Sequence, residues 1–168
     1  MIYTESFPIL FRAFPHPEAV VSGADFRFTV LTERLIRLEY DPQGLFEDRP
    51  SQVFWHRQQA RPDFTARQAN GQIEIETAHL LLVYRPDQGG FNPDSLQILV
   101  KELQVTWRYG DRDSQNLRGT ARTLDEAHFA VQLEPGLVSR SGWAMVDESA
   151  CLVFDQHGWL APRGAADG

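Results

Sequence analysis

The alternation of apolar and polar residues over short stretches limits most strongly what this chain can fold into. Phe26, Phe28 and Val30 alternate with polar residues, and the same period of two resumes over residues 35–40 after a polar turn. Residues two positions apart share one face of a β-strand, whereas an α-helix repeats every 3.6 residues. The pattern therefore predicts a β-hairpin over residues 26–40.

Further short extended segments follow, with turn residues between them. The Asn70 and Gly71 pair is a strong hairpin signal because both residues tolerate a positive φ. Residues 79–85 form the most apolar segment, which indicates burial on both faces. Besides the first hairpin, the predicted strands are residues 9–12, 52–56, 63–68, 72–77, 79–85, 96–101, 104–109, 143–146 and 151–154. Many short strands with hardly any helical period predict an all-β fold, an antiparallel β-sandwich or barrel with very little helix.

Length and composition are those of an ordinary globular domain. The chain has 168 residues, of which 42% are hydrophobic and 23% charged, and this composition argues against disorder. One core suffices for this length. We predict a single domain over residues 1–160, followed by a frayed linker or tail over residues 161–168.

The net charge and the cysteine content limit which classes of partner and which cellular compartment are expected. A net charge of -7, with Lys101 as the one lysine, disfavours a nucleic-acid partner, because phosphates are bound by clustered basic residues. No apolar run approaches the roughly 20 residues of a membrane helix, so no membrane partner is expected. The single cysteine, Cys151, excludes an intrachain disulfide and favours a cytoplasmic location, and the first residues lack the basic leader of a secretory signal.

Known catalytic motifs are missing from the sequence. It contains no nucleophile elbow, no phosphate-binding glycine loop and no dinucleotide fingerprint, so no cofactor is expected. No two of the five histidines are spaced for one helix face, so no metal site is expected. Acidic residues are plentiful, and glycoside hydrolysis needs two of them. Spacing along a loop does not give distance in space, so no catalytic residue is nominated.

Residues 116–149 differ from the strands before them. This stretch carries Gly136, Gly142 and three arginines without a sustained period, and loops longer than about 12–15 residues are often functional when ordered. We expect the strands to form a scaffold that presents this loop. An indole face suits the C–H face of a pyranose, so Trp143 is open to either sugar stacking or packing. The other three tryptophans, Trp55, Trp107 and Trp159, are expected to pack.

Three motifs of this loop occur in an order that resembles a known family. They read GTARTLD, LEPGLVSRSGW and VDES, and together they are similar to the end of the N-terminal domain of glycoside hydrolase family 31, the α-glucosidase and α-xylosidase family. The hairpin FRFTVLTERLIRLEYDP is similar to early strands of that domain. The resemblance covers most of the chain.

The resemblance implies a galactose-mutarotase-like β-sandwich that packs on a (β/α)8 barrel, which supplies both catalytic aspartates. It also implies that a loop of this domain reaches over the barrel mouth and helps to bind an α-glucoside or α-xyloside. In this chain that role falls on Arg140, Ser141 and Trp143, with Asp147 behind them. The family often carries an acid after the Ser-Arg pair. Here Ser141 takes that position, which puts a direct carboxylate contact from it in doubt.

Two other functions remain open from the sequence. A freestanding carbohydrate-binding module would use an exposed tryptophan as its platform. An enzyme of the mutarotase or epimerase kind would need a histidine and a carboxylate that converge in one concave face. If the chain is the domain of a family 31 enzyme, its docking face for the absent barrel is expected to be apolar and to drive self-association.

Overall fold

The computed structural model describes residues 10–119 and 128–164, and in these residues the chain is almost entirely β. The strands pair in antiparallel sheets, and helix is confined in the described residues to two 3₁₀ turns, Pro17–Ala19 (η1) and Pro86–Gln88 (η2). The predicted all-β, antiparallel class with very little helix is therefore confirmed. The chain divides into two compact units, one of Met1–Ala66 with Glu148–Gly168 and one of Arg67–Asp147. The single domain over residues 1–160 stays a prediction.

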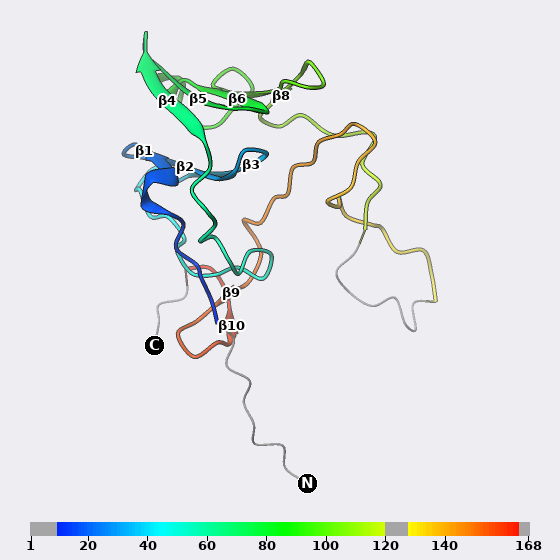
Figure 1. The fold of residues 1–168 in the computed structure, drawn as a ribbon. Helices are drawn as coiled ribbons and strands as arrows, with labels where there is room; N and C mark the ends of the chain where they lie inside the picture. Colours follow the sequence, from blue (N-terminus) through cyan, green and yellow to red (C-terminus); the bar gives the residue numbers. More distant parts are fainter. Residues whose placement is uncertain (1–9, 120–127, 165–168) are drawn as a thin grey trace. The chain divides into compact units, whose positions relative to one another are not determined.

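The first unit contains a three-stranded sheet and a small hairpin (Figure 1). The sheet has the order β1 (Val20–Ser22), β2 (Phe26–Thr32) and β3 (Leu35–Tyr40), and the hairpin joins β9 (Val153–Phe154) to β10 (Leu160–Ala161). Strands β2 and β3 are the predicted hairpin. Phe26, Phe28 and Val30 of β2 are buried, whereas the apolar residues of β3 are half-buried or exposed.

The segment of residues 52–56, which was predicted to be a strand, contains a tight turn instead. The backbone amides of Ser51 and Phe54 each donate to the carbonyl of the other, at 3.1 Å in both directions. This turn leaves only isolated bridges, such as that between Arg12 and His56. The strand predicted over residues 9–12 is likewise reduced to this bridge at Arg12. Ile9 lies outside the described residues. Strands β1 and β10 are three and two residues long and were not predicted.

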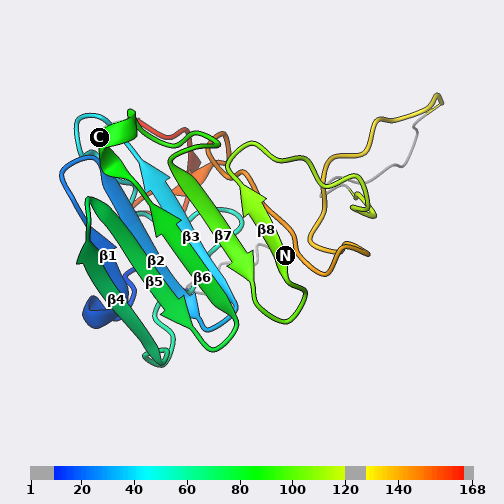
Figure 2. The same cartoon turned by 90° about the horizontal axis from the view of Figure 1, so that it is seen from above.

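The second sheet is a meander of five strands in chain order, β4 (Phe64–Ala69), β5 (Gln72–Thr77), β6 (Leu80–Tyr84), β7 (Leu96–Val100) and β8 (Val105–Arg108). Figure 2 shows β5 to β8 side by side. All five strands were predicted, with ends that differ by at most one residue. The turn between β4 and β5 places Asn70 at φ 52° and Gly71 at φ 75°, the positive values that this residue pair was expected to adopt.

Burial along β5 and β6 shows which face of this sheet is covered. Ile73 and Ile75 of β5 are buried, whereas the glutamates between them are partly exposed. In β6 only Leu82 and Tyr84 are buried, and the other three residues are half-buried. The prediction that this strand is buried on both faces is therefore wrong, because β6 alternates like its neighbour.

The strand predicted over residues 143–146 does not form. Residues 143–146 make no backbone-to-backbone hydrogen bond with another described residue, so they have no partner strand. The predicted strand 151–154 is shortened to β9. Within the described residues, no helix is long and apolar enough to span a bilayer.

Candidate functional site

The segment after β8 leaves the edge of the five-stranded sheet and carries all four predicted site residues (Figure 2). Two stretches of it, residues 115–119 and 134–140, run antiparallel and are called the two arms below. The Leu117 amide donates to the Val138 carbonyl at 2.9 Å. Gly119 and Glu134 exchange two backbone hydrogen bonds of 2.9 and 3.0 Å. The arms are therefore held by their own hydrogen bonds, without a regular strand.

The Asn116 side chain joins the two arms. Its Oδ1 accepts the amide of Gly136 at 2.8 Å, and its Nδ2 donates to the Gly136 carbonyl at 2.9 Å. A Cβ on Gly136 would lie 3.1 Å from the backbone of Arg118, so the close approach of the arms favours a glycine there. This contact explains why an asparagine and a glycine 20 positions apart matter to the same loop.

Residues 139–143 form a turn at the end of the second arm, opposite the connection between the arms, and this turn is called the tip below. A chain of side-chain hydrogen bonds shapes it. The Ser141 amide donates to the Ser139 hydroxyl at 3.0 Å, and the two hydroxyl oxygens lie 2.7 Å apart. The Ser141 hydroxyl also donates to Oδ1 of Asp113 at 2.9 Å. Gly142 completes the turn at φ 77°, a backbone conformation that favours glycine. The sequence assigned no role to Asp113.

The surroundings of Asp113 favour its charged form. The Ser139 hydroxyl has the largest effect, and together with the Gln115 amide and the Ser141 hydroxyl it holds the pKa of Asp113 below its ordinary value against the opposing effect of burial. The carboxylate therefore only accepts hydrogen bonds at neutral pH. Asp113 therefore acts as a hydrogen-bond acceptor for the Ser141 hydroxyl of the tip.

The predicted site residues differ in how they are exposed. Arg140 and Asp147 are exposed, whereas Ser141 and Trp143 are half-buried. The Arg140 side chain forms no hydrogen bond or ion pair with another described residue, so its guanidinium is available. The Ser141 hydroxyl is directed to Asp113 instead. The residues Thr120–Asp125 of the first family motif lie outside the described residues.

The remaining tryptophans divide between packing and exposure. Trp107 is buried, as predicted, whereas Trp55 is 39% exposed although its ring packs edge-on against Phe154 with centroids 5.4 Å apart. Trp159 is 74% exposed, so its predicted packing is wrong. It ends the turn between β9 and β10, where Oδ1 of Asp155 accepts its amide at 2.8 Å. The turn fixes the backbone of Trp159, and the two-stranded hairpin does not cover its ring.

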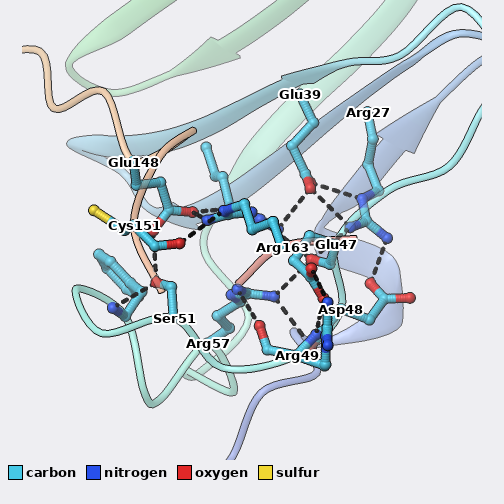
Figure 3. A network of polar contacts seen from close by, with 12 residues as sticks. Arg27, Glu39, Glu47, Asp48, Arg49, Ser51, Arg57, Glu148, Cys151 and Arg163 are labelled. Atoms are coloured by element: carbon cyan, nitrogen blue, oxygen red, sulfur yellow. Dashed lines mark hydrogen bonds and ion pairs between the residues drawn. The ribbon is translucent and has the colours of Figure 1, made fainter. Parts of the chain in front are cut away.

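A second cluster of charged side chains lies in the first unit (Figure 3). At its centre is Arg57, which is 1% exposed. Its guanidinium donates to the carbonyls of Glu47 at 3.1 Å, Asp48 at 3.3 Å and Arg49 at 2.8 Å. Burial, and after it the positive charge of Arg37, lower the pKa of Arg57 to about 10, so it stays charged at neutral pH. Sequence reasoning missed this residue because one arginine at the end of a short segment gives no periodic signal.

Glu148 joins this cluster to the end of the long loop. Its carboxylate accepts the Ser51 hydroxyl at 2.6 Å and Nε of Arg37 at 3.1 Å. Burial raises the pKa of Glu148, but the Ser51 hydrogen bond and the positive charges of Arg37, Arg163 and Arg57 outweigh it, and the net pKa lies below its ordinary value. Other ion pairs of the cluster are Arg27 with Glu39 and Asp48, Arg37 with Glu39, and Arg49 with Glu47.

An open hollow of about 620 Å³ borders this cluster. Its polar lining consists of paired groups: Arg27 and Asp48 bind each other, and Arg49 binds Glu47. Since each of these charges already has a partner, the lining favours a structural role over ligand binding. We therefore place the candidate site on the loop.

Two further kinds of site were searched for in the described residues. No group of three or more His, Cys, Asp or Glu side chains there is arranged to hold a metal ion. A histidine and a carboxylate do meet, since Nδ1 of His79 lies 2.9 Å from Oε1 of Glu102. This pair lies at turns next to β6 and β7 and does not line the hollow described above.

A comparison with models of known protein families finds no match to this chain, and a comparison with curated proteins finds none either. A functional proposal therefore depends on the geometry of the loop and on its sequence motifs.

Proposed function

We propose that this chain is the non-catalytic N-terminal β-sandwich domain of a cytoplasmic family 31 α-glycosidase. In this proposal it packs on the catalytic barrel and lends its long loop to the pocket for an α-glucoside or α-xyloside. The observation that carries the proposal is a loop without strands that is nevertheless held by its own hydrogen bonds and carries an exposed arginine three positions before a half-buried tryptophan. An internally braced loop of this kind is suited to present side chains to a ligand.

The tip has the chemistry that a neutral sugar requires. The Arg140 guanidinium offers several N–H donors to hydroxyl oxygens, and the Trp143 indole offers a face for the C–H side of a pyranose. Sugar pockets combine such donors with an apolar surface. A loop of this length that covers the mouth of a barrel also excludes water from the reacting bond.

Asp113, beside the loop, is not suited to serve as the general acid of glycoside hydrolysis. A general acid for hydrolysis must be protonated near the working pH. Asp113 is instead held in its charged form by hydroxyl and amide donors. This supports the proposal that the general acid comes from the partner barrel.

Exposed apolar side chains on the arms provide a docking surface in this proposal. Leu117, Leu137 and Val138 are exposed on the two arms, and Phe129 is exposed on the segment between them. The backbone bond between Leu117 and Val138 places two of these residues side by side. Exposed apolar groups of this kind mark interaction surfaces. We propose that the barrel covers them in the parent enzyme and that they drive self-association of the isolated chain.

Sugar titration tests the proposal against the rival function of a freestanding binding module. With glucose, xylose or maltose, we expect no saturable change in tryptophan fluorescence, because the loop supplies only one wall of the pocket. Saturable binding would favour the module.

The exposure of Trp159 is the observation that favours the module. If saturable binding occurs and is lost in Trp159→Ala but kept in Trp143→Ala, the platform is the hairpin turn and the proposal of a loop site fails. The Trp107 ring is buried and serves as an internal reference for the fluorescence of the fold.

A further inference from the structure

We propose that Asp113 is the positioning residue of the loop tip, which holds residues 139–143 in one conformation so that Arg140 and Trp143 are presented together. The contact with sugar rests on the function proposed above. The claim about the conformation of the tip does not depend on it and can be tested on this chain alone.

Two hydrogen bonds tie the tip to the segment that contains Asp113, and a third orders that segment. The Ser141 hydroxyl and the Gln115 amide both donate to Oδ1 of Asp113, at 2.9 and 3.0 Å. The Gln115 carbonyl in turn accepts the amide of Arg140 at 3.2 Å. Oδ1 of Asp113 thus binds both Gln115, two positions away, and Ser141 of the tip, 28 positions away.

The second oxygen of Asp113 indicates that this arrangement is specific. Oδ2 is buried and has no hydrogen-bond partner among the described residues. Burial of a carboxylate oxygen is costly, and an acid at the surface that only keeps the protein soluble does not incur this cost. The donors on Oδ1, the Ser141 hydroxyl and the Gln115 amide, offset this cost for the charged form.

The arrangement assigns different roles to the neighbouring residues of the tip. Because its hydroxyl proton is directed to Asp113, Ser141 supports the tip rather than donating to a ligand. The Arg140 side chain remains as the donor that faces outward. A tip that is already ordered loses less conformational entropy when a sugar binds, and such preorganisation favours affinity.

Hydrogen exchange of the intact chain tests this inference through three backbone amides. In Asp113→Ala the Gln115 amide loses its acceptor directly, so faster exchange there is expected in any case. The amides of Arg140 and Ser141 bond to other groups, the Gln115 carbonyl and the Ser139 hydroxyl. If Asp113 positions the tip, both of these amides also exchange about tenfold faster or more, as the loss of a charged hydrogen bond predicts.

Two comparisons separate this role from general destabilisation. The control Asp87→Ala changes an exposed aspartate of η2 and should leave all three amides unchanged, and the amides of β6 and β7 should stay protected in every variant. Ser141→Ala should accelerate Arg140, and the double variant should add little to the effect of Asp113→Ala, because both changes remove the hydrogen bond between Ser141 and Asp113. Unchanged exchange at Arg140 and Ser141 in Asp113→Ala, or fully additive effects, would overturn the inference. No sugar or barrel is present, so neither outcome depends on the proposed function.

Discussion

Replacement of Arg57 by methionine is expected to lower the free energy of unfolding by about 3 kcal/mol, since three carbonyl groups lose their donor at roughly 1 kcal/mol each. The side chain is buried and donates to the carbonyls of residues 47–49. A buried ion pair can often be replaced by apolar residues at no net cost because both partners are removed together. Here the partners are backbone carbonyls, and they remain in place.

Urea unfolding at pH 7, followed by circular dichroism, measures this effect. The matched control is Arg61→Met, because Arg61 pairs with Glu18 while both side chains are largely exposed. That pair is expected to contribute about 0.5 kcal/mol or less. A second variant, Arg57→Lys, keeps the charge but not the planar fork of donors, and it should lie between the two. If Arg57→Met were as stable as Arg61→Met, the structural role assigned to Arg57 would be wrong.

Replacement of Glu148 by glutamine is expected to cost about 2 kcal/mol at pH 7, since it removes a partly buried charge that is paired and hydrogen-bonded. The loss should depend on pH in a defined direction. The pKa of Glu148 in the folded chain lies below its ordinary value of 4.5. Its contribution is therefore complete above pH 4.5 and is lost as the pH falls through the folded pKa.

The difference in unfolding free energy between the wild type and Glu148→Gln should accordingly shrink below pH 4.5, because the protonated wild type comes to resemble the variant. Urea midpoints of both proteins between pH 7 and pH 3 measure this difference. Glu18→Gln serves as the control, since Glu18 is exposed, and its difference from the wild type should stay small throughout. A constant difference between the wild type and Glu148→Gln over this range would show that the charge of Glu148 is not what stabilises the fold.

Most strands of the fold could be predicted because their signal lies in the pattern of neighbouring residues. The alternation at Phe26–Thr32 and the Asn70 and Gly71 turn are properties of neighbouring residues, and the structure confirms both. The segment around Ser51 was misread because a turn closed by two backbone bonds can carry a composition similar to that of a strand. Very short strands such as β10 are too brief for any period to be seen.

The candidate site was only partly accessible from the sequence. The loop could be singled out by its length and its lack of period. Its internal support could not, because Asp113 and Ser141 are 28 positions apart and their contact exists only once the arms pair. The cluster around Arg57 escaped prediction for the same reason, since Arg37 and Glu148 meet across 111 positions. Ion pairs and hydrogen bonds between distant segments follow from the fold and leave no local pattern.

The release of aryl alcohol from an aryl α-glucoside or α-xyloside tests the central proposal most directly. The rate is measured for the purified chain alone, for a family 31 catalytic barrel that lacks its own N-terminal domain, and for the two together. The account predicts that the chain alone stays at the buffer blank, and that its addition raises the rate of the barrel, less so when it carries Arg140→Ala and Trp143→Ala. Turnover by the chain alone that survives repurification, or no effect of the chain on the barrel, would contradict the account.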